Sequence, residues 1–284
     1  MRRLWLPLLF AIVTGFRLTI YVVVPANAGI DARVYTAAAE AWLTGGDPWT
    51  ATVDGVVFAA PPTSLLPFIP FIGLDPRITA FVWMVGCFVV AAFAIRALRL
   101  PLWWLAFPPI ADGIMVASLD IAVLGLLVIA HGRLGALAPL LKIYALIPMV
   151  GERRWRDLLF AAALLGASLL VLPWGEWFAR LPEISANLAG TAGTTSVYGS
   201  PVLMAVGAVA LAALGLRRAG WLAVPVLWPS TQPHYMAVSA PGLVPFIAAA
   251  WCFPHPFVTL GSVVIYAIYA QRERWTRPTG SIRG

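Results

Sequence analysis

The chain has 284 residues, 61% of them hydrophobic and only 11% charged, and its net charge is +7. A soluble domain carries about 25% charged residues, so this composition excludes a water-soluble globule. The arginines lie at the ends of apolar runs, which indicates topology signals and contacts with membrane lipids rather than a nucleic-acid partner. The composition therefore predicts an all-α, polytopic integral membrane protein.

The first apolar stretch, residues 4–24, is predicted to be a transmembrane helix. The alternative is a signal peptide that is cleaved after Ala26-Asn27-Ala28, but the stretch is longer than a typical signal-peptide core and contains Arg17. The later apolar stretches are 61–73, 78–98, 101–117, 119–131, 134–150, 158–173, 200–216, 219–229, 236–252 and 256–270.

Because a span needs about 20 apolar residues, these stretches predict about 10–11 transmembrane helices in a single transmembrane domain, residues 1–284. Stretches 61–73, 119–131 and 219–229 are too short to cross a bilayer if straight. We expect them to be half-helices, or to begin inside a cavity of the protein, where non-helical backbone is tolerated at membrane depth.

Two polar stretches, 25–60 and 174–199, are long enough to carry a functional site. Positively charged loops usually face the cytoplasm, so arginine clusters predict the orientation. The clearest clusters are Arg2-Arg3, the loop with Arg153, Arg154 and Arg156, and Arg217-Arg218. They place both polar stretches on the outer face of the cell membrane. Arg96, Arg99, Arg133 and the basic C-terminal tail fit this orientation poorly.

Within 25–60, the residues after Gly29 are predicted to form a short amphipathic helix that lies in the membrane interface. Its apolar residues recur at helical spacing, at Val34, Ala38, Ala41 and Trp42. Asp31 stands where the helix begins and is expected to serve either as its N-cap or as a functional carboxylate. Gly45-Gly46 is expected to end the helix, and Asp47 to shape the turn that follows.

Several motifs, taken in their order along the chain, resemble glycosyltransferase family 87. The first is Asp31-x-x-Val34-Tyr35, followed by Gly46-Asp47-Pro48-Trp49 and Pro61-Pro62. The later ones are Lys142 in the middle of an apolar helix, Thr194-Thr195-Ser196-Val197-Tyr198, and Pro229-x-x-x-x-His234-Tyr235. The chain departs from the family at Ala60, where members often have Tyr, at Leu119-Asp120, where they often have Gly-Gln, and at Ile143, where they usually have Pro.

Members of this family are polyprenol-phosphate-mannose-dependent mannosyltransferases of the membrane-embedded C-type fold. The resemblance implies an inverting transfer of a sugar from a polyprenyl-phosphate donor to an envelope lipid or glycan acceptor. Asp31 matches the family's general base. His234 and Arg17, then Lys142, are the candidates to meet the charge of the lipid phosphate, with Tyr35 and Tyr235 also binding substrate. No cofactor is implied, and no metal-ligand spacing is present in the sequence.

Other interpretations stay open at this stage. The protein could instead be a transporter or flippase of lipid-linked sugars, or an inactive relative, although the sequence shows no repeated halves of the kind many transporters have. Ionisable residues in apolar runs are costly and could simply pair with each other, for example Asp120 with Lys142 or Arg17. Asp112 belongs to the same group. His131, His255 and the two cysteines, Cys87 and Cys252, are expected to have no role in the site.

Overall fold

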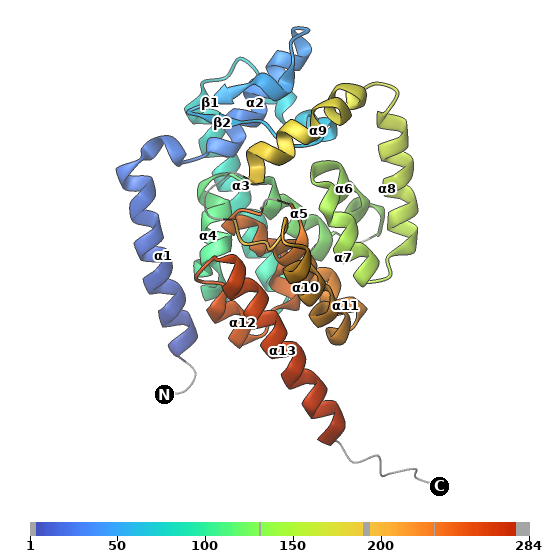
Figure 1. Cartoon of the computed structure of the whole chain (residues 1–284). Helices are drawn as coiled ribbons and strands as arrows, with labels where there is room; N and C mark the ends of the chain where they lie inside the picture. The colour runs from blue at the N-terminus through green and yellow to red at the C-terminus, as the bar shows by residue number, and fades with distance from the viewer. Residues whose placement is uncertain (1–3, 131, 190–193, 230, 277–284) are drawn as a thin grey trace.

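The computed structural model describes residues 4–130, 132–189, 194–229 and 231–276, which are almost entirely helical (Figure 1). This confirms the all-α class. Two very short strands, β1 (Thr52–Val53) and β2 (Val56–Val57), pair antiparallel in a small hairpin. Arg2, Arg3, His131, Arg277 and Arg283, on which some expectations rest, lie outside the described residues.

The α-helices are α1 (Trp5–Val23), α2 (Ile30–Leu43), α3 (Pro76–Ala97), α4 (Pro108–Met115), α5 (Leu119–Val128), α6 (Ala138–Leu141), α7 (Leu146–Gly151), α8 (Trp155–Ser168), α9 (Trp174–Ala189), α10 (Pro201–Leu214), α11 (Leu216–Leu227), α12 (Pro245–Ala250) and α13 (Pro256–Thr276). The 3₁₀ segments are η1 (Pro25–Asn27), η2 (Pro48–Thr50), η3 (Pro62–Phe71), η4 (Leu102–Ala106), η5 (Gly132–Leu137), η6 (Ile143–Ala145) and η7 (Pro233–Gly242).

Two of the described helices, α1 and α3, are long and apolar enough to cross a membrane by length and composition. The pair α4 and α5 would make a third span, but the two helices meet at a bend of 120°. The sequence predicts about 10–11 transmembrane helices, and the difference arises because several helices are short, such as α10 with 14 residues and α11 with 12, and because other apolar stretches are interrupted. The stretch 236–252, for example, is divided between η7 and α12.

The interruption with the largest consequence lies at Lys142. The sequence predicts this lysine in the middle of an apolar helix, but it stands between α6 and η6 in an extended conformation, with φ −145° and ψ 115°. A continuous helix would place Pro148 in its interior, where proline removes a hydrogen bond and clashes with the preceding turn. The break instead lets Pro148 lie in the first turn of the next helix, α7.

The second polar stretch, 174–199, contains a helix that the sequence analysis did not predict. α9 begins at Trp174, and the rings of Trp174, Trp177 and Phe178 pack against one another in its first turns. In Figure 1, α9 lies at the same end of the molecule as α2 and the β1–β2 hairpin. The two stretches selected as candidate site regions therefore lie at one end of the fold.

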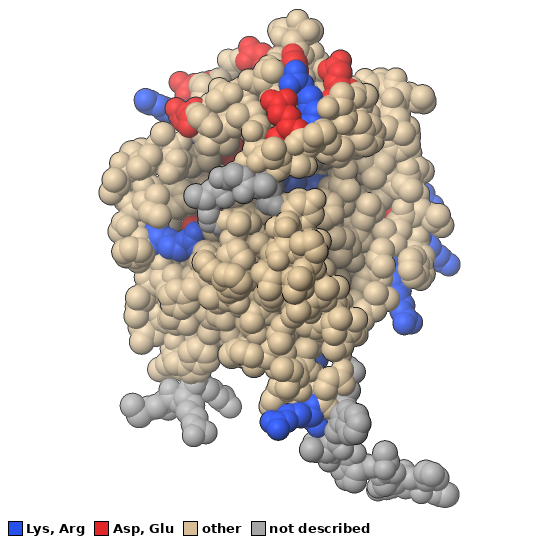
Figure 2. Space-filling model, in the orientation of Figure 1, with Lys and Arg blue, Asp and Glu red and all other residues tan. Residues whose placement is uncertain are grey.

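Charges are distributed unevenly over the molecule. In Figure 2, acidic side chains gather at the end where Figure 1 shows α2 and α9, and several Lys and Arg side chains lie towards the opposite end and on the flank. Two basic residues at the α2–α9 end have acidic partners: Arg33 pairs with Asp54, and Arg180 with Asp47. The asymmetry is of the kind that the positive-inside rule describes.

The arginines that fit the predicted orientation poorly lie towards the end of the molecule away from α2 and α9, which we call the basic end. The ring of Phe10, in the first half of α1, lies 5.4 Å from the rings of both Trp103 and Trp104 in η4, so the turn with Arg96 and Arg99 lies near the start of α1. Arg154 donates a hydrogen bond of 3.0 Å to the carbonyl of Leu127 and so ties the α5 end to the loop before α8. Figure 1 shows the start of α1 and the end of α13 at this same end.

Candidate active site

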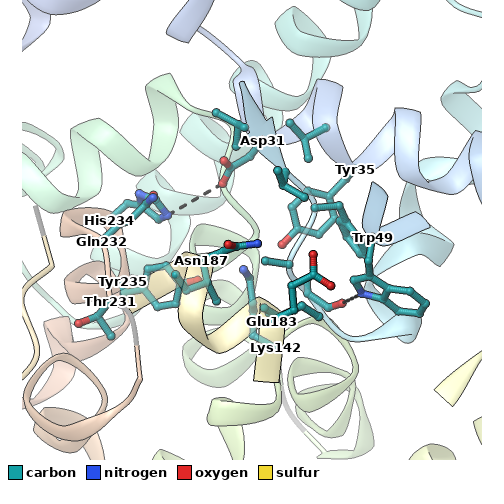
Figure 3. Close-up of a pocket in the computed structure, with 18 of the residues that line it drawn as sticks. Asp31, Tyr35, Trp49, Lys142, Glu183, Asn187, Thr231, Gln232, His234 and Tyr235 are labelled. Atoms are coloured by element: carbon teal, nitrogen blue, oxygen red, sulfur yellow. Dashed lines mark hydrogen bonds and ion pairs between the residues drawn. The ribbon is translucent and has the colours of Figure 1, made fainter. Parts of the chain in front are cut away.

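Five of the six predicted site residues line one cavity of about 400 Å³ beneath α9 (Figure 3). They are Asp31, Tyr35, Lys142, His234 and Tyr235. The remaining wall comes from α2, η2, the β1–β2 hairpin with the residues that follow it, α9, and the segments before α10 and η7. These residues are Val34, Trp49, 55–60, Arg180, Glu183, Ile184, Asn187, Leu188, Thr194, Thr231 and Gln232. Segments from four distant parts of the chain thus converge on one enclosure.

Asp31 owes its position to the end of α4. The backbone N–H of Gly29 donates to the carbonyl of Met115 at 2.7 Å, and the N–H of Asp31 donates to that of Val116 at 3.0 Å. The N-cap position belongs to Gly29, in a left-handed conformation with φ 65°. The expectation that Asp31 caps the helix is therefore wrong, since α4 carbonyls already satisfy these N–H groups. Its carboxylate is left to face the cavity, with 18% of the side chain exposed.

The surroundings of Asp31 favour its protonated form relative to a carboxylate in water. Burial raises the pKa of Asp31 above its usual value, and the nearby Asp120 charge raises it further. The charges of His234 and Lys142, together with a hydrogen bond from Ser118, act against burial. A carboxylate with a raised pKa is a stronger base once ionised, which suits general-base chemistry near neutral pH.

Lys142 presents its ammonium group to the cavity between two aromatic rings. Its Nζ lies 5.6 Å from the ring centre of Tyr35 and 5.2 Å from that of Tyr235, which are cation–π distances (Figure 3). Burial raises the pKa of the Tyr35 phenol, so this hydroxyl stays protonated and can donate a hydrogen bond. The three side chains together form a cationic site with hydroxyl donors, which is suited to a phosphate group.

His234 is the second residue of η7, and two carboxylates approach its Nε2. Its Nε2 is 3.3 Å from Oδ2 of Asp120 and 4.0 Å from Oδ2 of Asp31. The turn before it is held by Thr195, whose N–H donates to the carbonyl of Thr231 at 2.8 Å. η7 lies against α4 at this point, since a Cβ at Gly113 would lie 3.6 Å from the Cβ of His234, an ordinary van der Waals contact.

Asp120 is a site residue that sequence reasoning missed. Its expected partners were Lys142 or Arg17, but the closest ionisable group is His234, and its side chain has no exposed surface. The only sequence signal is the departure from the Gly-Gln pair of family 87 at Leu119-Asp120. That difference marks residue 120 as unusual, but it does not predict that the Asp120 side chain contacts His234.

Arg17 does not line the cavity. It forms an ion pair with Asp112 of α4, and the Tyr21 hydroxyl donates to the same carboxylate at 3.5 Å. This is the ion-pairing alternative that the sequence left open for Arg17, with Asp112 rather than Asp120 as the partner. Its predicted contact with substrate has no counterpart in this arrangement.

α9 supplies a polar wall that the sequence did not predict. Arg180 pairs with Asp47 in the turn after α2 and with Glu183 at 3.2 Å, so an ion-pair network links α9 to the α2 region. In Figure 3, the side chains of Glu183 and Asn187 point towards the cavity. The helical spacing of apolar residues in 174–189 could have predicted α9, but the polar residues of this stretch led to its interpretation as a loop.

Asp47 also accepts a hydrogen bond from the N–H of Trp49 at 2.9 Å, as the predicted turn residue should.

Among the described residues, Cys87, Cys252 and His255 do not line this cavity. Cys87 and Cys252 are buried and free. His255 accepts a hydrogen bond from the N–H of Phe257 at 3.3 Å beside α13. Within the described residues, no group of three or more His, Cys, Asp or Glu side chains is arranged to hold a metal ion.

Comparison with known proteins does not add a family. No protein-family model, no curated protein and no solved structure matches the chain. The function is therefore argued from the motifs in the sequence and from the chemistry of the cavity.

Proposed function

We propose that the protein is a multi-pass membrane glycosyltransferase of the C-type fold, similar to family 87. It transfers a sugar, mannose by the family's example, from a polyprenyl-phosphate donor to an envelope lipid or glycan. The observation that carries this proposal is the convergence of Asp31, His234 and the Lys142–tyrosine site on one cavity. These are the residues that the motifs select, although they are up to about 200 positions apart in the chain.

The proposed reaction assigns roles to Asp31 and to the site formed by Lys142, Tyr35 and Tyr235. Asp31 accepts the proton of the acceptor hydroxyl while its oxygen attacks the anomeric carbon of the donor. The bond from that carbon to the phosphate oxygen breaks on the opposite face, and its electron pair leaves with the polyprenyl phosphate. Lys142, with the hydroxyls of Tyr35 and Tyr235, meets the charge that develops on the phosphate. The configuration at the anomeric carbon is inverted, because one displacement occurs.

Asp31 is a better base than Glu183, the other carboxylate that lines the cavity. The Glu183 side chain is 64% exposed and is paired with Arg180. Asp31 is mostly buried and has a raised pKa. Burial strengthens electrostatic interactions and excludes water, which would compete with the acceptor for the donor sugar.

The proposal also places the protein in the cell membrane with the cavity on its outer face. The two helices long enough to span a bilayer support the membrane location. The grouping of arginines at the end away from α2 and α9 supports the orientation (Figure 2). The short helices on either side of each break in the other apolar stretches are then half-helices. They are packed inside protein, where irregular backbone at membrane depth is tolerated.

The test is the transfer of radiolabelled mannose from polyprenyl phosphate in proteoliposomes. Asp31→Asn keeps the size of the side chain but removes the proton acceptor, and we expect it to lower transfer at least ~100-fold, since general-base catalysis contributes about 10²–10⁴-fold. The control is Asp54→Asn. It removes an exposed carboxylate of the β1–β2 hairpin that pairs with Arg33 of α2, the helix that carries Asp31. It should leave transfer close to that of the unmutated protein.

Three outcomes would contradict the proposal in whole or in part. Full activity in Asp31→Asn would remove the carboxylate from the mechanism. If the unmutated protein leaves several lipid-linked donors intact but moves them across the bilayer, it is a flippase, and if it does neither, it is an inactive relative. Both can be measured in the same vesicles, with the donor enclosed or added outside.

A further inference from the structure

Asp120 is a buried carboxylate whose presence the local fold does not require. It lies in the first turn of α5, but the N-cap of that helix is Ser118, whose Oγ accepts the N–H of Asp120 at 3.3 Å. One carboxylate oxygen, Oδ2, accepts a hydrogen bond of 2.7 Å from the Ser118 hydroxyl. The other, Oδ1, is buried and has no hydrogen-bond partner among the described residues. A charge buried with so few partners is costly, so another role must account for it.

The ionisable neighbour closest to this carboxylate is the imidazole of His234, at 3.3 Å from Nε2 to Oδ2. The same nitrogen is 4.0 Å from Oδ2 of Asp31. An ionised carboxylate only accepts hydrogen bonds, so a nitrogen 3.3 Å from Oδ2 of Asp120 has to carry a proton to bond to it. Asp120 thereby selects one tautomer of His234 and fixes the orientation of the ring.

The backbone holds the three groups in this order. Asp31 is hydrogen-bonded to the end of α4 through the carbonyl of Val116, and Ser118 and Asp120 follow directly in the chain. His234 lies against the same helix at Gly113. Asp31 faces the cavity, whereas Asp120 does not line it, has no exposed surface and approaches the same nitrogen of His234. Asp120 therefore reaches the cavity through its contact with His234, besides the effect of its charge on Asp31.

We propose that Asp120 is a positioning residue that holds the proton of His234 on Nε2 and directs the ring towards the Asp31 carboxylate. The expected effect of Asp120 on the reaction rate rests on the proposed glycosyl transfer. The assignment of the His234 tautomer does not depend on it. The inference goes beyond the family resemblance, because the resemblance assigns no carboxylate to this position.

The first test is a ¹⁵N NMR spectrum of the full-length protein labelled only at histidine. The chain has three histidines, and the His234 signals are assigned by their loss in His234→Gln. We expect a protonated Nε2 in the unmutated protein and a change of these signals in both Asp120→Asn and Asp120→Leu. The control Asp112→Asn removes another buried carboxylate and should leave the Nε2 proton in place. A neutral His234 protonated only on Nδ1, or signals unmoved by the Asp120 variants, would overturn the inference.

The second test is a double-mutant cycle on mannose transfer. Asp120→Asn should lower kcat at least ~10-fold, the lower end of the loss seen when the carboxylate that orients a metal-ligating histidine is mutated, and should change the KM for the donor little. In the His234→Gln background, the same change should cost less than about twofold further. Independent, multiplicative losses would mean that Asp120 acts by general stability. If no variant of the protein transfers sugar, the glycosyltransferase proposal fails, while the NMR result still decides the role of Asp120.

Discussion

Lys142 shows how one side chain controls the chemistry of another across the cavity. Its charge counteracts the effect of burial on Asp31, and so do His234 and the Ser118 hydroxyl, whereas the charge of Asp120 reinforces burial. The pKa of Asp31 is raised on balance. A base must be ionised to act, so activity should be lost as the pH falls through this raised pKa, at a higher pH than for an ordinary aspartate.

Lys142→Met should therefore have two separable effects. Loss of the ammonium group raises the pKa of Asp31 further, so the acidic limb of the kcat/KM profile should move to higher pH. Loss of the contact with the leaving phosphate should lower kcat about 100-fold above that limb. Lys142→Arg keeps the charge and should leave the limb in place. An unmoved limb in Lys142→Met would show that the lysine does not act on Asp31.

Individual site residues could be predicted to different extents. Asp31, Tyr35, Lys142, His234 and Tyr235 were selected because they stand in motifs, and the structure brings all five together. Arg17 was also selected, but a charge in an apolar run indicates only that it needs a partner, and Asp112 provides one. The position of Asp120 beside His234 depends on the approach of η7 to α4 and α5, which the local sequence does not encode.

Among the elements, α2 was predicted well, and its position depends on one glycine. Gly29 has φ 65°, and a Cβ there would lie only 2.3 Å from the Cβ of Ala80 on α3. An alanine would be strained in this conformation and would also push α2 away from α3.

Gly29→Ala should destabilise the protein by about 2–4 kcal/mol, from the left-handed backbone and the overpacking together. It should also lower sugar transfer, since it displaces the start of α2, which carries Asp31. The matched control is Gly86→Ala in α3, where a Cβ meets nothing within 4 Å and alanine favours the helix. Thermal unfolding in detergent measures both. Equal melting temperatures for the two variants would contradict this account of the α2–α3 contact.

Elements with internal prolines were predicted less well. Apolar runs such as 134–150 and 236–252 look continuous by hydropathy, and their division depends on how each proline is accommodated. Pro148 and Pro245 both lie in the first turn of a short helix, α7 and α12. Hydropathy measures whether a segment prefers an apolar environment, and it is insensitive to the direction of the backbone, so the count of about 10–11 spans was not reproduced.

At the scale of the whole molecule, the separation of charge predicts which surfaces are accessible from outside the cell. A cysteine at Glu176, exposed on α9, should react with a membrane-impermeant maleimide added to intact cells. A cysteine at Arg217, whose side chain is 80% exposed, should react only after the membrane is permeabilised. Labelling of Arg217→Cys alone in intact cells would invert the orientation.

The hydrogen bonds between residues 29–31 and the end of α4 also determine when the site can assemble during synthesis of the chain. Asp31 leaves the ribosome early, but its anchoring carbonyls follow about 85 residues later, and His234 about 200 residues later. At a synthesis rate of about 5–20 residues per second, the last interval is roughly 10–40 s. During that time the nascent chain holds an acidic residue at the membrane interface without its partner histidine. A ribosome-stalled chain that ends before residue 229 should therefore insert its first helices but remain unable to close the cavity.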